Sequence, residues 1–472
     1  MNKSSASPAN RTDLKSHPLY QDMIPPFSES EAVADASRCL LCGLVEGDGY
    51  DVAPCIKGCP TQIDIPGFIK SIKEGNRVEA AETVFAENIL GATCGRVCPV
   101  DILCEGECVL NEQGEQAIQI GRLQRYATEE LLDQGHSFRK AGNSNGKKIS
   151  VIGAGPAGLS CAAELAEKGY EVTVYDKNDQ AGGLIRYGIA PYRIHGKPLT
   201  DEIRMIEQMG VTFRLGEAID SEEKLRSIEE NSDALFLGVG VKGVKLDPEG
   251  DVEVPGDNLQ GVWDSMDFIH HVKTENPVEV GHTVAIIGGG NTALDVGVQA
   301  KRLGASIVNI LYRRTEDYMP AYGHEIELAR QEGVNIQFLI RPLEIYGDEK
   351  GKVTSMKIQH MKLEGYDQDE RPVPVPVEGT EAIIPVDTVV KAVGPRRREM
   401  FLDWVGDFFL GDLTFKKGLI EIDPETGQSG HPKYFAGGDS ISGGGTVVEA
   451  VQDGKRAANG IDTYLREQKG VS

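Results

Sequence analysis

The chain has 472 residues and a formal net charge of −24; 40% of its residues are hydrophobic and 26% are charged. At roughly 100–200 residues per domain, this length predicts two to four domains. The acidic balance argues against binding to nucleic acid or to anionic lipid, because both need clustered Lys and Arg. No apolar run approaches the ~20 residues of a membrane span. The polar first 18 residues are better explained as a disordered tail than as a transit peptide.

Residues 1–146 hold eight of the nine cysteines together with helical patterns, and we predict a helical domain there. The cysteine pattern is Cys39-x2-Cys42-x12-Cys55-x3-Cys59-Pro60 followed by Cys94-x3-Cys98-Pro99-x4-Cys104-x3-Cys108. Two quartets of thiolates with Cys-Pro steps are typical of two [4Fe–4S] clusters. The alternatives are zinc and free or disulfide-bonded cysteines. Four-cysteine zinc sites use tight CxxC pairs, and only Cys39 and Cys42 have that spacing. Metal-bound thiolates in a large chain indicate a reducing, cytoplasmic location.

A first dinucleotide site is predicted after a linker at 141–148. The sequence Gly153-Ala-Gly155-Pro156-Ala157-Gly158 follows an expected strand and opens an expected helix. In this pattern the first glycine permits the turn, the second lets the backbone approach a pyrophosphate, and the third lets helix and strand pack closely. Asp176 ends the next expected strand, where an acid binds ribose hydroxyls.

The first site resembles the FAD site of the two-domain flavoprotein reductases, and the C-terminal region supports this interpretation. Gly438-Asp439 is similar to the flavoprotein element whose Asp binds the FAD ribitol, although a helix cap is the alternative role for Asp439. A helix expected to start near Thr446 and Val447 would direct backbone N–H groups at the reduced flavin. Gly183 is the remaining FAD-binding candidate.

A second dinucleotide site is predicted at Gly288-Gly-Gly290-Asn291-Thr292-Ala293, which also lies between an expected strand and helix. The next strand ends at Arg313-Arg314 rather than at an acid. Because an Arg accommodates the 2′-phosphate of NADP, this favours NADPH, with NADH still possible and with two solvated surface arginines as the alternative.

The predicted fold class is therefore α/β: an N-terminal α-helical iron–sulfur domain followed by two Rossmann-like domains, the second inserted in the first. The expected domains are 1–146, then 147–265 with 391–472 for FAD, and 266–390 for NAD(P)H. No general base is nominated, since hydride transfer depends on stacking and orientation. The ninth cysteine, Cys161, is interpreted as a core residue.

Together these motifs resemble the small subunit of NADPH-dependent glutamate synthase and its relatives. The relatives include the N-terminal half of dihydropyrimidine dehydrogenase and the large subunit of NADH-dependent ferredoxin:NADP oxidoreductase. The resemblance covers nearly the whole chain, and its most specific stretches are CGRVCPVDILCEGEC (94–108), IGRLQRYATE (120–129), YRR (312–314), YMP (318–320) and AGGD (436–439).

The resemblance also implies a ligand assignment. It gives Cys39, Cys42, Cys55 and Cys108 to one cluster. It gives Cys59, Cys98, Cys104 and Gln124 to the other, with Cys94 in place of Gln124 as the alternative. The 12-residue spacer between Cys42 and Cys55 is longer than in many relatives.

The function implied is an electron-transfer subunit that links NADPH, FAD and two clusters to a larger catalytic partner, with glutamate synthesis as the default pathway. Subunits of other complexes are the alternatives: bifurcating ferredoxin:NADP oxidoreductase, dihydropyrimidine dehydrogenase, sulfide or aldehyde oxidoreductase, or hydrogenase. Ferredoxin is a further possible partner. A non-catalytic redox-sensing scaffold is the alternative from a different class.

Overall fold

The computed structural model describes residues 18–240, 254–274, 278–367, 370–393, 413–416 and 418–469. It confirms the predicted α/β fold class. The chain forms two compact units. The smaller unit comprises residues up to Met23, 187–195 and 247–396, and the larger unit comprises 24–186, 196–246 and 397–472. Most of the predicted N-terminal tail lies outside the described residues.

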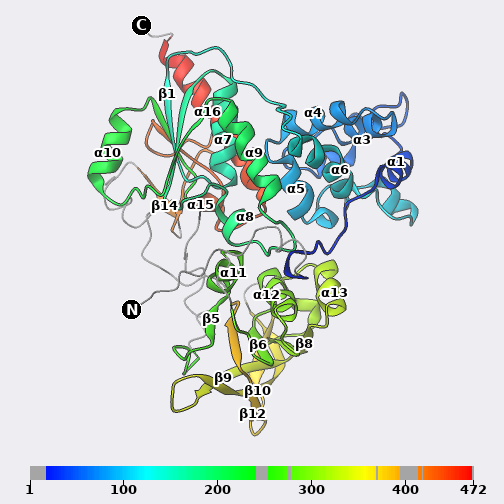
Figure 1. The fold of residues 1–472 in the computed structure, drawn as a ribbon, viewed down its shortest axis with the longest axis vertical. Helices are drawn as coiled ribbons and strands as arrows, with labels where there is room; N and C mark the ends of the chain where they lie inside the picture. The colour runs from blue at the N-terminus through cyan, green and yellow to red at the C-terminus, as the bar shows by residue number, and fades with distance from the viewer. Residues whose placement is uncertain are drawn as a thin grey trace, which may run out of the picture. The chain divides into compact units, whose positions relative to one another are not determined.

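The first part of the larger unit is helical, as predicted (Figure 1). Ser28 starts the first helix with a capping box, in which its side chain accepts from the backbone N–H of Glu31 and its own N–H donates to the Glu31 carboxylate. Asp64 and Asn76 cap the N-termini of α3 and α4 in the same way, by side-chain bonds to backbone N–H groups. The α-helices are α1 (Glu29–Ser37), α2 (Pro54–Lys57), α3 (Ile65–Lys73), α4 (Arg77–Glu87), α5 (Gly91–Val97) and α6 (Ile120–Asp133).

The second part of the larger unit is a five-stranded parallel sheet in the order β16-β4-β1-β2-β3. All four residues of β4 are buried, as expected for a strand covered on both faces. The strands are β1 (Lys148–Ile152), β2 (Glu171–Asp176), β3 (Thr212–Leu215), β4 (Ala234–Leu237) and β16 (Tyr434–Ala436), with a small hairpin of β14 (Phe415–Lys416) and β15 (Leu419–Ile420).

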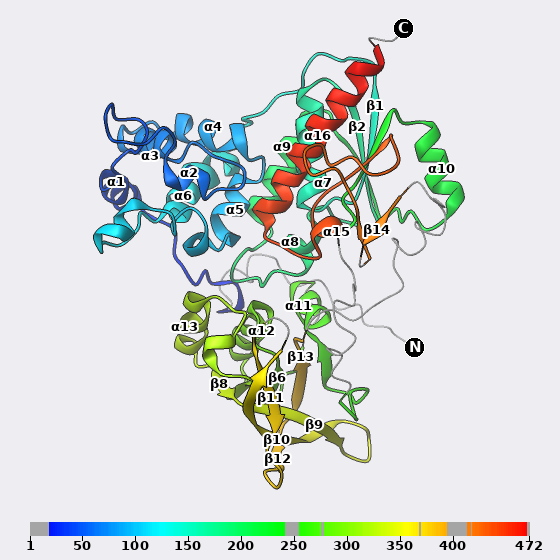
Figure 2. The same ribbon diagram turned by 180° about the vertical axis from the view of Figure 1, so that it is seen from behind.

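Helices connect and cover this sheet, and α16 packs along α7 (Figure 2). The helices are α7 (Pro156–Glu167), α8 (Gly183–Tyr187), α9 (Lys197–Gln208), α10 (Glu222–Glu230), α15 (Asp439–Ser442) and α16 (Val447–Lys469). In the described part of the chain, no helix combines the length and the apolar character needed to cross a membrane.

The smaller unit repeats the same architecture with a second parallel sheet, in the order β5-β13-β6-β7-β8. An antiparallel sheet of β9 to β12 extends it. Its strands are β5 (Val262–Asp264), β6 (Thr283–Ile287), β7 (Ile307–Tyr312), β8 (Asn335–Phe338), β9 (Ile340–Gly347), β10 (Val353–Tyr366), β11 (Pro372–Pro376), β12 (Ala382–Pro385) and β13 (Thr388–Lys391). Its α-helices are α11 (Ser265–Lys273), α12 (Asn291–Arg302) and α13 (Gly323–Gln331).

The two sheets show how one dinucleotide fold is inserted in the other. The strand β16 completes the first sheet although the whole second sheet lies between β4 and β16 in the chain. The strand β5 pairs with β13 in the second sheet, just before the predicted boundary at residue 265. The chain passes from β5 through α11 to β6, and both strands belong to the second sheet. The predicted domain limits otherwise stay predictions.

Within the larger unit, ionic contacts join the helical part to the flavin-type sheet domain. Arg139 donates to the carbonyl of Phe85 at 3.2 Å and pairs with Glu164 at 3.0 Å. Lys455 on α16 pairs with Glu87 at the end of α4 at 2.7 Å. Because Arg139 is buried, loss of its partner Glu164 would be costly, so this pair holds the two parts in one arrangement.

Candidate functional site

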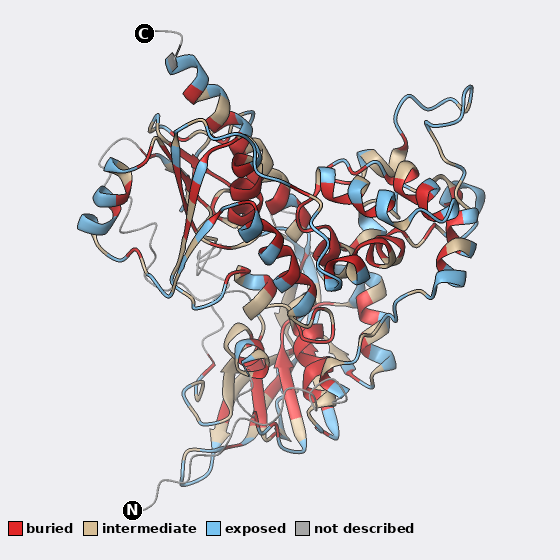
Figure 3. Ribbon diagram, turned by 45° about the horizontal axis from the view of Figure 1, so that its top comes forward, coloured by how far each residue is buried: buried red, intermediate tan, exposed pale blue. Residues whose placement is uncertain are grey.

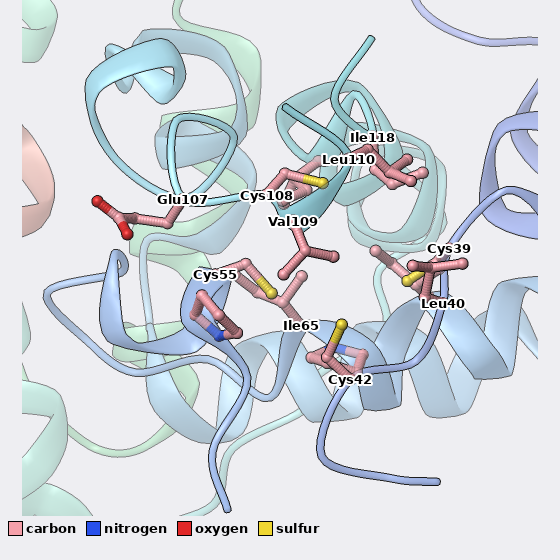
Figure 4. Close-up of a pocket in the computed structure, with 14 residues that line it drawn as sticks. Cys39, Leu40, Cys42, Cys55, Ile65, Glu107, Cys108, Val109, Leu110 and Ile118 are labelled. Carbon is pink, nitrogen blue, oxygen red and sulfur yellow. The ribbon is translucent and has the colours of Figure 1, made fainter. Parts of the chain in front are cut away.

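Four cysteines surround one pocket in the helical part of the larger unit. They are Cys39, Cys42, Cys55 and Cys108. Figure 4 shows their sulfur atoms directed into the same space, with Leu40, Ile65 and Val109 around them. This donor set suits an iron–sulfur cluster, because the irons of such clusters are held by thiolates inside an apolar shell. We call these four residues the outer set.

The outer set is only partly shielded from water, since all four cysteines are half-buried. Burial raises the pKa of Cys55 to about 12, and the neighbouring thiols of Cys39 and Cys108 add to the effect. Burial also raises the pKa of Cys39 and of Cys42. Without a bound metal these groups are therefore thiols, and bound iron would hold them as thiolates.

A second group of cysteines contains two buried and two half-buried members. The hydrogen bond with Cys94, burial, and the thiols of Cys104 and Cys59 together hold the pKa of Cys98 well above its usual value. Burial, with Glu105 and Cys59 nearby, does the same for Cys104. Cys59 and Cys94 are buried. We call Cys59, Cys94, Cys98 and Cys104 the inner set, and it includes the cysteines of both Cys-Pro steps, Cys59 and Cys98.

Both predicted candidates for the last ligand adjoin the inner set. Cys94 sits on α5, and the hydrogen bond with Cys98 places it directly in the group. Gln124 is buried on α6, and its side-chain amide donates to the carbonyl of Gly91 at the start of α5 at 2.5 Å. The structure therefore brings Gln124 to the helix that carries Cys94 and leads into Cys98.

The inner set shares a hydrophobic core with the start of α16. Val448 is buried in the same cluster of residues as Cys59 and Cys94, and Val447 packs against that cluster. Cys98 and Cys104 pack against this core, and so do Cys39, Cys55 and Cys108 of the outer set. The start of the flavin-side chain segment is nevertheless closer to the inner set, because α16 contacts α5, which carries Cys94. The sequence predicted Val447 at the flavin, so the start of one helix lies beside the inner set and in the predicted flavin site.

The first glycine turn has the geometry of a dinucleotide site. Gly153 has φ +107°, and an added Cβ would lie 2.2 Å from the carbonyl oxygen of Gly238. An added Cβ at Gly158 would lie 1.9 Å from the carbonyl oxygen of Gly153. At Gly155, by contrast, an added Cβ would meet nothing within 4 Å. Two glycines thus serve packing, and the third leaves open space at the N-terminus of α7, where a pyrophosphate would bind.

The other predicted flavin residues surround this turn. Asp176, at the end of β2, accepts a hydrogen bond from the backbone N–H of Ala154 at 2.8 Å. A Cβ added at Gly183 would lie 2.8 Å from the Cα of Gly155, so the start of α8 packs against the turn. Pro156 and Ala157 form the first turn of α7. These residues are therefore placed to bind FAD, and Asp176 also stabilises the glycine turn.

The C-terminal flavin element lies against the same helix. A Cβ added at Gly438, which has φ +71°, would lie 3.1 Å from the Cβ of Ala157. Burial raises the pKa of Asp439, with Asp453 and Glu449 adding to the effect. Thr446 starts α16 with a capping arrangement, because its N–H and hydroxyl both donate to Glu449, at 2.7 and 2.8 Å. Asp439 is the first residue of α15.

The second glycine turn, in the smaller unit, follows the same plan. Gly288 has φ +138°, and an added Cβ would lie 2.3 Å from the carbonyl oxygen of Ala392. At Gly290 the nearest atom to an added Cβ would be 3.9 Å away, on Pro320. Asn291, Thr292 and Ala293 open α12, and Ala293 is fully buried. This turn too leaves room for a pyrophosphate at its middle glycine position.

The two predicted 2′-phosphate arginines differ in their surroundings. Arg313 is exposed. Arg314 is buried, donates from Nε to the carbonyl of Pro372 at 2.9 Å, and pairs with Asp367 at 3.4 Å. Arg314 therefore stabilises the fold between β7 and β11, and Arg313 is the arginine placed to meet a ligand.

One buried network of the smaller unit was not predicted from the sequence. Tyr192 donates to Asp295 on α12 at 2.6 Å, and Arg193 donates to the same carboxylate at 2.7 Å. Arg193 also binds both oxygens of Glu325. Despite burial, the hydrogen bonds from His324 and Arg193 hold the pKa of Glu325 at about 2. The network fixes the helix that follows the second glycine turn.

Comparisons with known proteins agree with this architecture. Residues 16–136 match the family described as dihydropyrimidine dehydrogenase domain II, 4Fe–4S cluster. Residues 147–454 match the pyridine nucleotide-disulphide oxidoreductase family. The structure of Mycobacterium tuberculosis FprA in complex with NADPH shares the fold, with a TM-score of 0.54 and 18% identity over 69% of this chain and 85% of FprA.

Curated relatives match over nearly the whole chain. The glutamate synthase [NADPH] small chain of Escherichia coli K12 is 34% identical over 94% of each protein. The NAD-dependent dihydropyrimidine dehydrogenase subunit PreT of the same strain is 34% identical over 94% of this chain and 97% of its own length. The NADP(+)-dependent formate dehydrogenase subunit beta of Moorella thermoacetica is 36% identical over 89% of this chain and 60% of its own length.

These matches confirm the predicted family and the predicted enzyme class. Cys161 is fully buried in α7, as expected of a core residue. The chain therefore belongs to the family of glutamate synthase small chains and related pyridine nucleotide-disulphide oxidoreductases, and it is an oxidoreductase that works with a nicotinamide dinucleotide, FAD and 4Fe–4S chemistry.

Proposed function

We propose that this chain oxidises NADPH and passes the electrons through FAD, a cluster on the inner set and a cluster on the outer set to a larger partner subunit. The observation that carries the proposal is that α16 contacts α5, the helix that carries Cys94, and that Val448 is buried in one cluster with Cys59 and Cys94. It brings the inner set next to the start of α16, where the flavin is expected. The outer set, half-buried around its own pocket, then forms the exit.

The chain's own residues would bind and orient the cofactors. The open backbone at Gly155 and Gly290 would receive the two pyrophosphates, and Asp176 would bind a ribose. Arg313 would bind the 2′-phosphate, which favours NADPH over NADH. Bound FAD supplies the conversion between a two-electron hydride and the single electrons that iron–sulfur clusters accept. Thiolate ligands of this kind require a reducing compartment, for which we propose the cytoplasm.

The fourth ligand of the inner cluster is proposed to be Gln124, with Cys94 as the alternative within the same set. The two ligand candidates are distinguished by replacing each residue in turn and measuring the number of irons per chain. The Gln124→Ala variant should lose roughly four of about eight irons if Gln124 is the ligand, and the Cys94→Ala variant should keep them. The reverse result would assign the site to Cys94.

Glutamate synthase is the proposed assembly, supported by 34% identity over 94% of both chains. A second candidate, a subunit of another reductase complex, is supported by the equally similar relatives from formate and dihydropyrimidine dehydrogenases. The test is anaerobic purification from the native host, with iron, flavin and partner analysis of one sample. About eight irons and one FAD per chain with a large co-eluting amidotransferase would support glutamate synthase. The same cofactors with another partner would support the second candidate, and zinc in place of iron would contradict both.

A further inference from the structure

The segment between Cys39 and Cys55 carries an unusual exposed apolar surface. Large apolar side chains are 37–51% exposed here, although a lone exposed residue would need no explanation. They gather within 13 positions of the chain. They are Leu40, Leu44, Val45, Tyr50 and Val52. We call these five residues the outer face; Figure 3 shows that the chain between α1 and α2 is drawn mostly as exposed.

The loop that bears the outer face is held in one conformation. The Asp48 carboxylate accepts from the backbone N–H of Gly43 at 2.6 Å and from that of Tyr50 at 2.9 Å. A Cβ added at Gly43 would lie 3.3 Å from the backbone N of Ala53 and 3.7 Å from the carbonyl oxygen of Tyr50. The two limbs of the loop therefore lie side by side, and Leu44 and Val45 belong to the same region of surface as Tyr50 and Val52.

The outer face borders the outer set. Leu40 is 49% exposed and at the same time lines the pocket with Cys39 and Cys42 (Figure 4). Leu40 stands between the two cysteines in the chain. A protein docked on this face would therefore lie within a few side chains of the pocket, where an electron leaves the proposed outer cluster.

Charge indicates what kind of protein fits. Glu46 and Asp51 are exposed beside the outer face, and Asp48 adds a third carboxylate. No Lys or Arg occurs between Cys39 and Ile56. Because complementary charge steers encounter and suppresses wrong partners, the matching surface should be apolar at its centre and basic at its rim.

We propose that the outer face docks the electron-accepting protein, through an apolar contact ringed by basic residues of that protein. The inference rests on the proposed function and adds the place and chemistry of the exit. Each encounter would transfer one electron, so oxidation of one NADPH to NADP⁺ and H⁺ would reduce two acceptor molecules by one electron each.

The test uses mitochondrial cytochrome c as the probe, because its haem edge is apolar and surrounded by lysines. Binding of oxidised cytochrome c to the anaerobic holoprotein is measured by calorimetry at low salt, beside its NADPH-dependent reduction. Leu44→Ser with Val45→Ser should weaken binding roughly tenfold through loss of apolar contact. Glu46→Lys with Asp51→Lys should weaken it at least as much and should reduce its dependence on salt.

Two control variants separate the outer face from general surface properties. Glu223→Lys with Glu230→Lys makes the same charge change at exposed positions of α10, and Ile383→Ser removes an apolar side chain that is 64% exposed on β12. Both should bind cytochrome c like the wild type. Wild-type binding by the outer-face variants, or equal losses in the controls, would overturn the proposal. Failure of the wild type to reduce ferricyanide with NADPH would instead contradict the proposed function, whatever the binding result.

Discussion

The outer and inner cysteine sets come from the same short region of sequence but lie in different environments. The four outer cysteines are half-buried around a pocket, beside an exposed apolar loop. In the inner set Cys59 and Cys94 are buried while Cys98 and Cys104 are half-buried, and the helix that carries Cys94 contacts α16 on the flavin side. Similar ligands therefore acquire different roles from their neighbours: the inner set faces the proposed electron source, and the outer set faces the proposed exit.

Removing one ligand from each set should have the largest effect on iron content and on electron transfer. Cys59→Ser and Cys39→Ser should each lose roughly four irons and lower NADPH-dependent reduction of a protein acceptor by about 100-fold or more. NADPH-dependent reduction of ferricyanide, a small acceptor able to take electrons at the flavin, should fall far less. Iron analysis and the two acceptor assays check this. Cys161→Ala is the matched control, because this buried thiol belongs to neither set and should leave the iron content unchanged.

A methyl group added in the first glycine turn should weaken the binding of FAD, which is the proposed source of electrons for both sets. In Gly155→Ala the new Cβ meets no protein atom within 4 Å, so the fold should be kept while FAD affinity falls roughly 10–100-fold. In Gly158→Ala the Cβ would lie 1.9 Å from a backbone oxygen, so the fold itself should be destabilised. Flavin content and thermal unfolding distinguish the two. Full FAD occupancy in Gly155→Ala would refute the proposed pyrophosphate position.

The third prediction concerns the preference for NADPH over NADH at Arg313. Arg313→Ala should raise the KM for NADPH roughly tenfold and leave that for NADH nearly unchanged, because only NADPH carries the 2′-phosphate. Arg314→Ala should instead lower the unfolding temperature, since it leaves the carbonyl of Pro372 without its buried donor. Steady-state kinetics with both nucleotides checks the first expectation. Equal losses with NADPH and NADH in Arg313→Ala would contradict it.

The smallest expected effect concerns Glu202, which anchors the helix of the inner set. This fully buried carboxyl accepts from the N–H of Ala92 at 2.7 Å and from that of Thr93 at 3.1 Å, at the start of α5. Burial raises its pKa to about 8 from the usual 4.5. Between these values the unfolded chain releases a proton that the folded chain keeps, so stability should fall as pH rises from about 5 to about 8 and then level off.

Glu202→Gln should remove this part of the pH dependence, which is on the order of 5 kcal/mol. The amide keeps an acceptor for α5 and stays neutral. Urea unfolding of the anaerobic holoprotein at several pH values measures the effect, and Glu202→Ala should be less stable at every pH because α5 loses its acceptor. Parallel pH profiles for wild type and Glu202→Gln would show that Glu202 keeps its ordinary pKa.

The glycine turns were predicted from residues close together in the chain. The inserted second sheet was predicted from the order of the glycine turns and strands, and the grouping of the cysteines was implied by the family resemblance. Contacts between residues far apart in the sequence could not be predicted from local patterns. The bond from Thr93 to Glu202 spans 109 residues, and that from Tyr192 to Asp295 spans 103. Equally, neighbouring residues such as Arg313 and Arg314 look alike in sequence, and only the packing of β11 separates a buried structural arginine from an exposed one.

The order of the two sets is tested most directly by electron paramagnetic resonance of the holoprotein after anaerobic mixing with NADPH. In Cys39→Ser the inner set is intact and next to the flavin side, so we predict a reduced-cluster signal that forms as fast as in the wild type. In Cys59→Ser the path to the outer set is interrupted, and we predict no signal on the same timescale. Rapid reduction of the remaining cluster in Cys59→Ser, with none in Cys39→Ser, would reverse the assignment of entrance and exit.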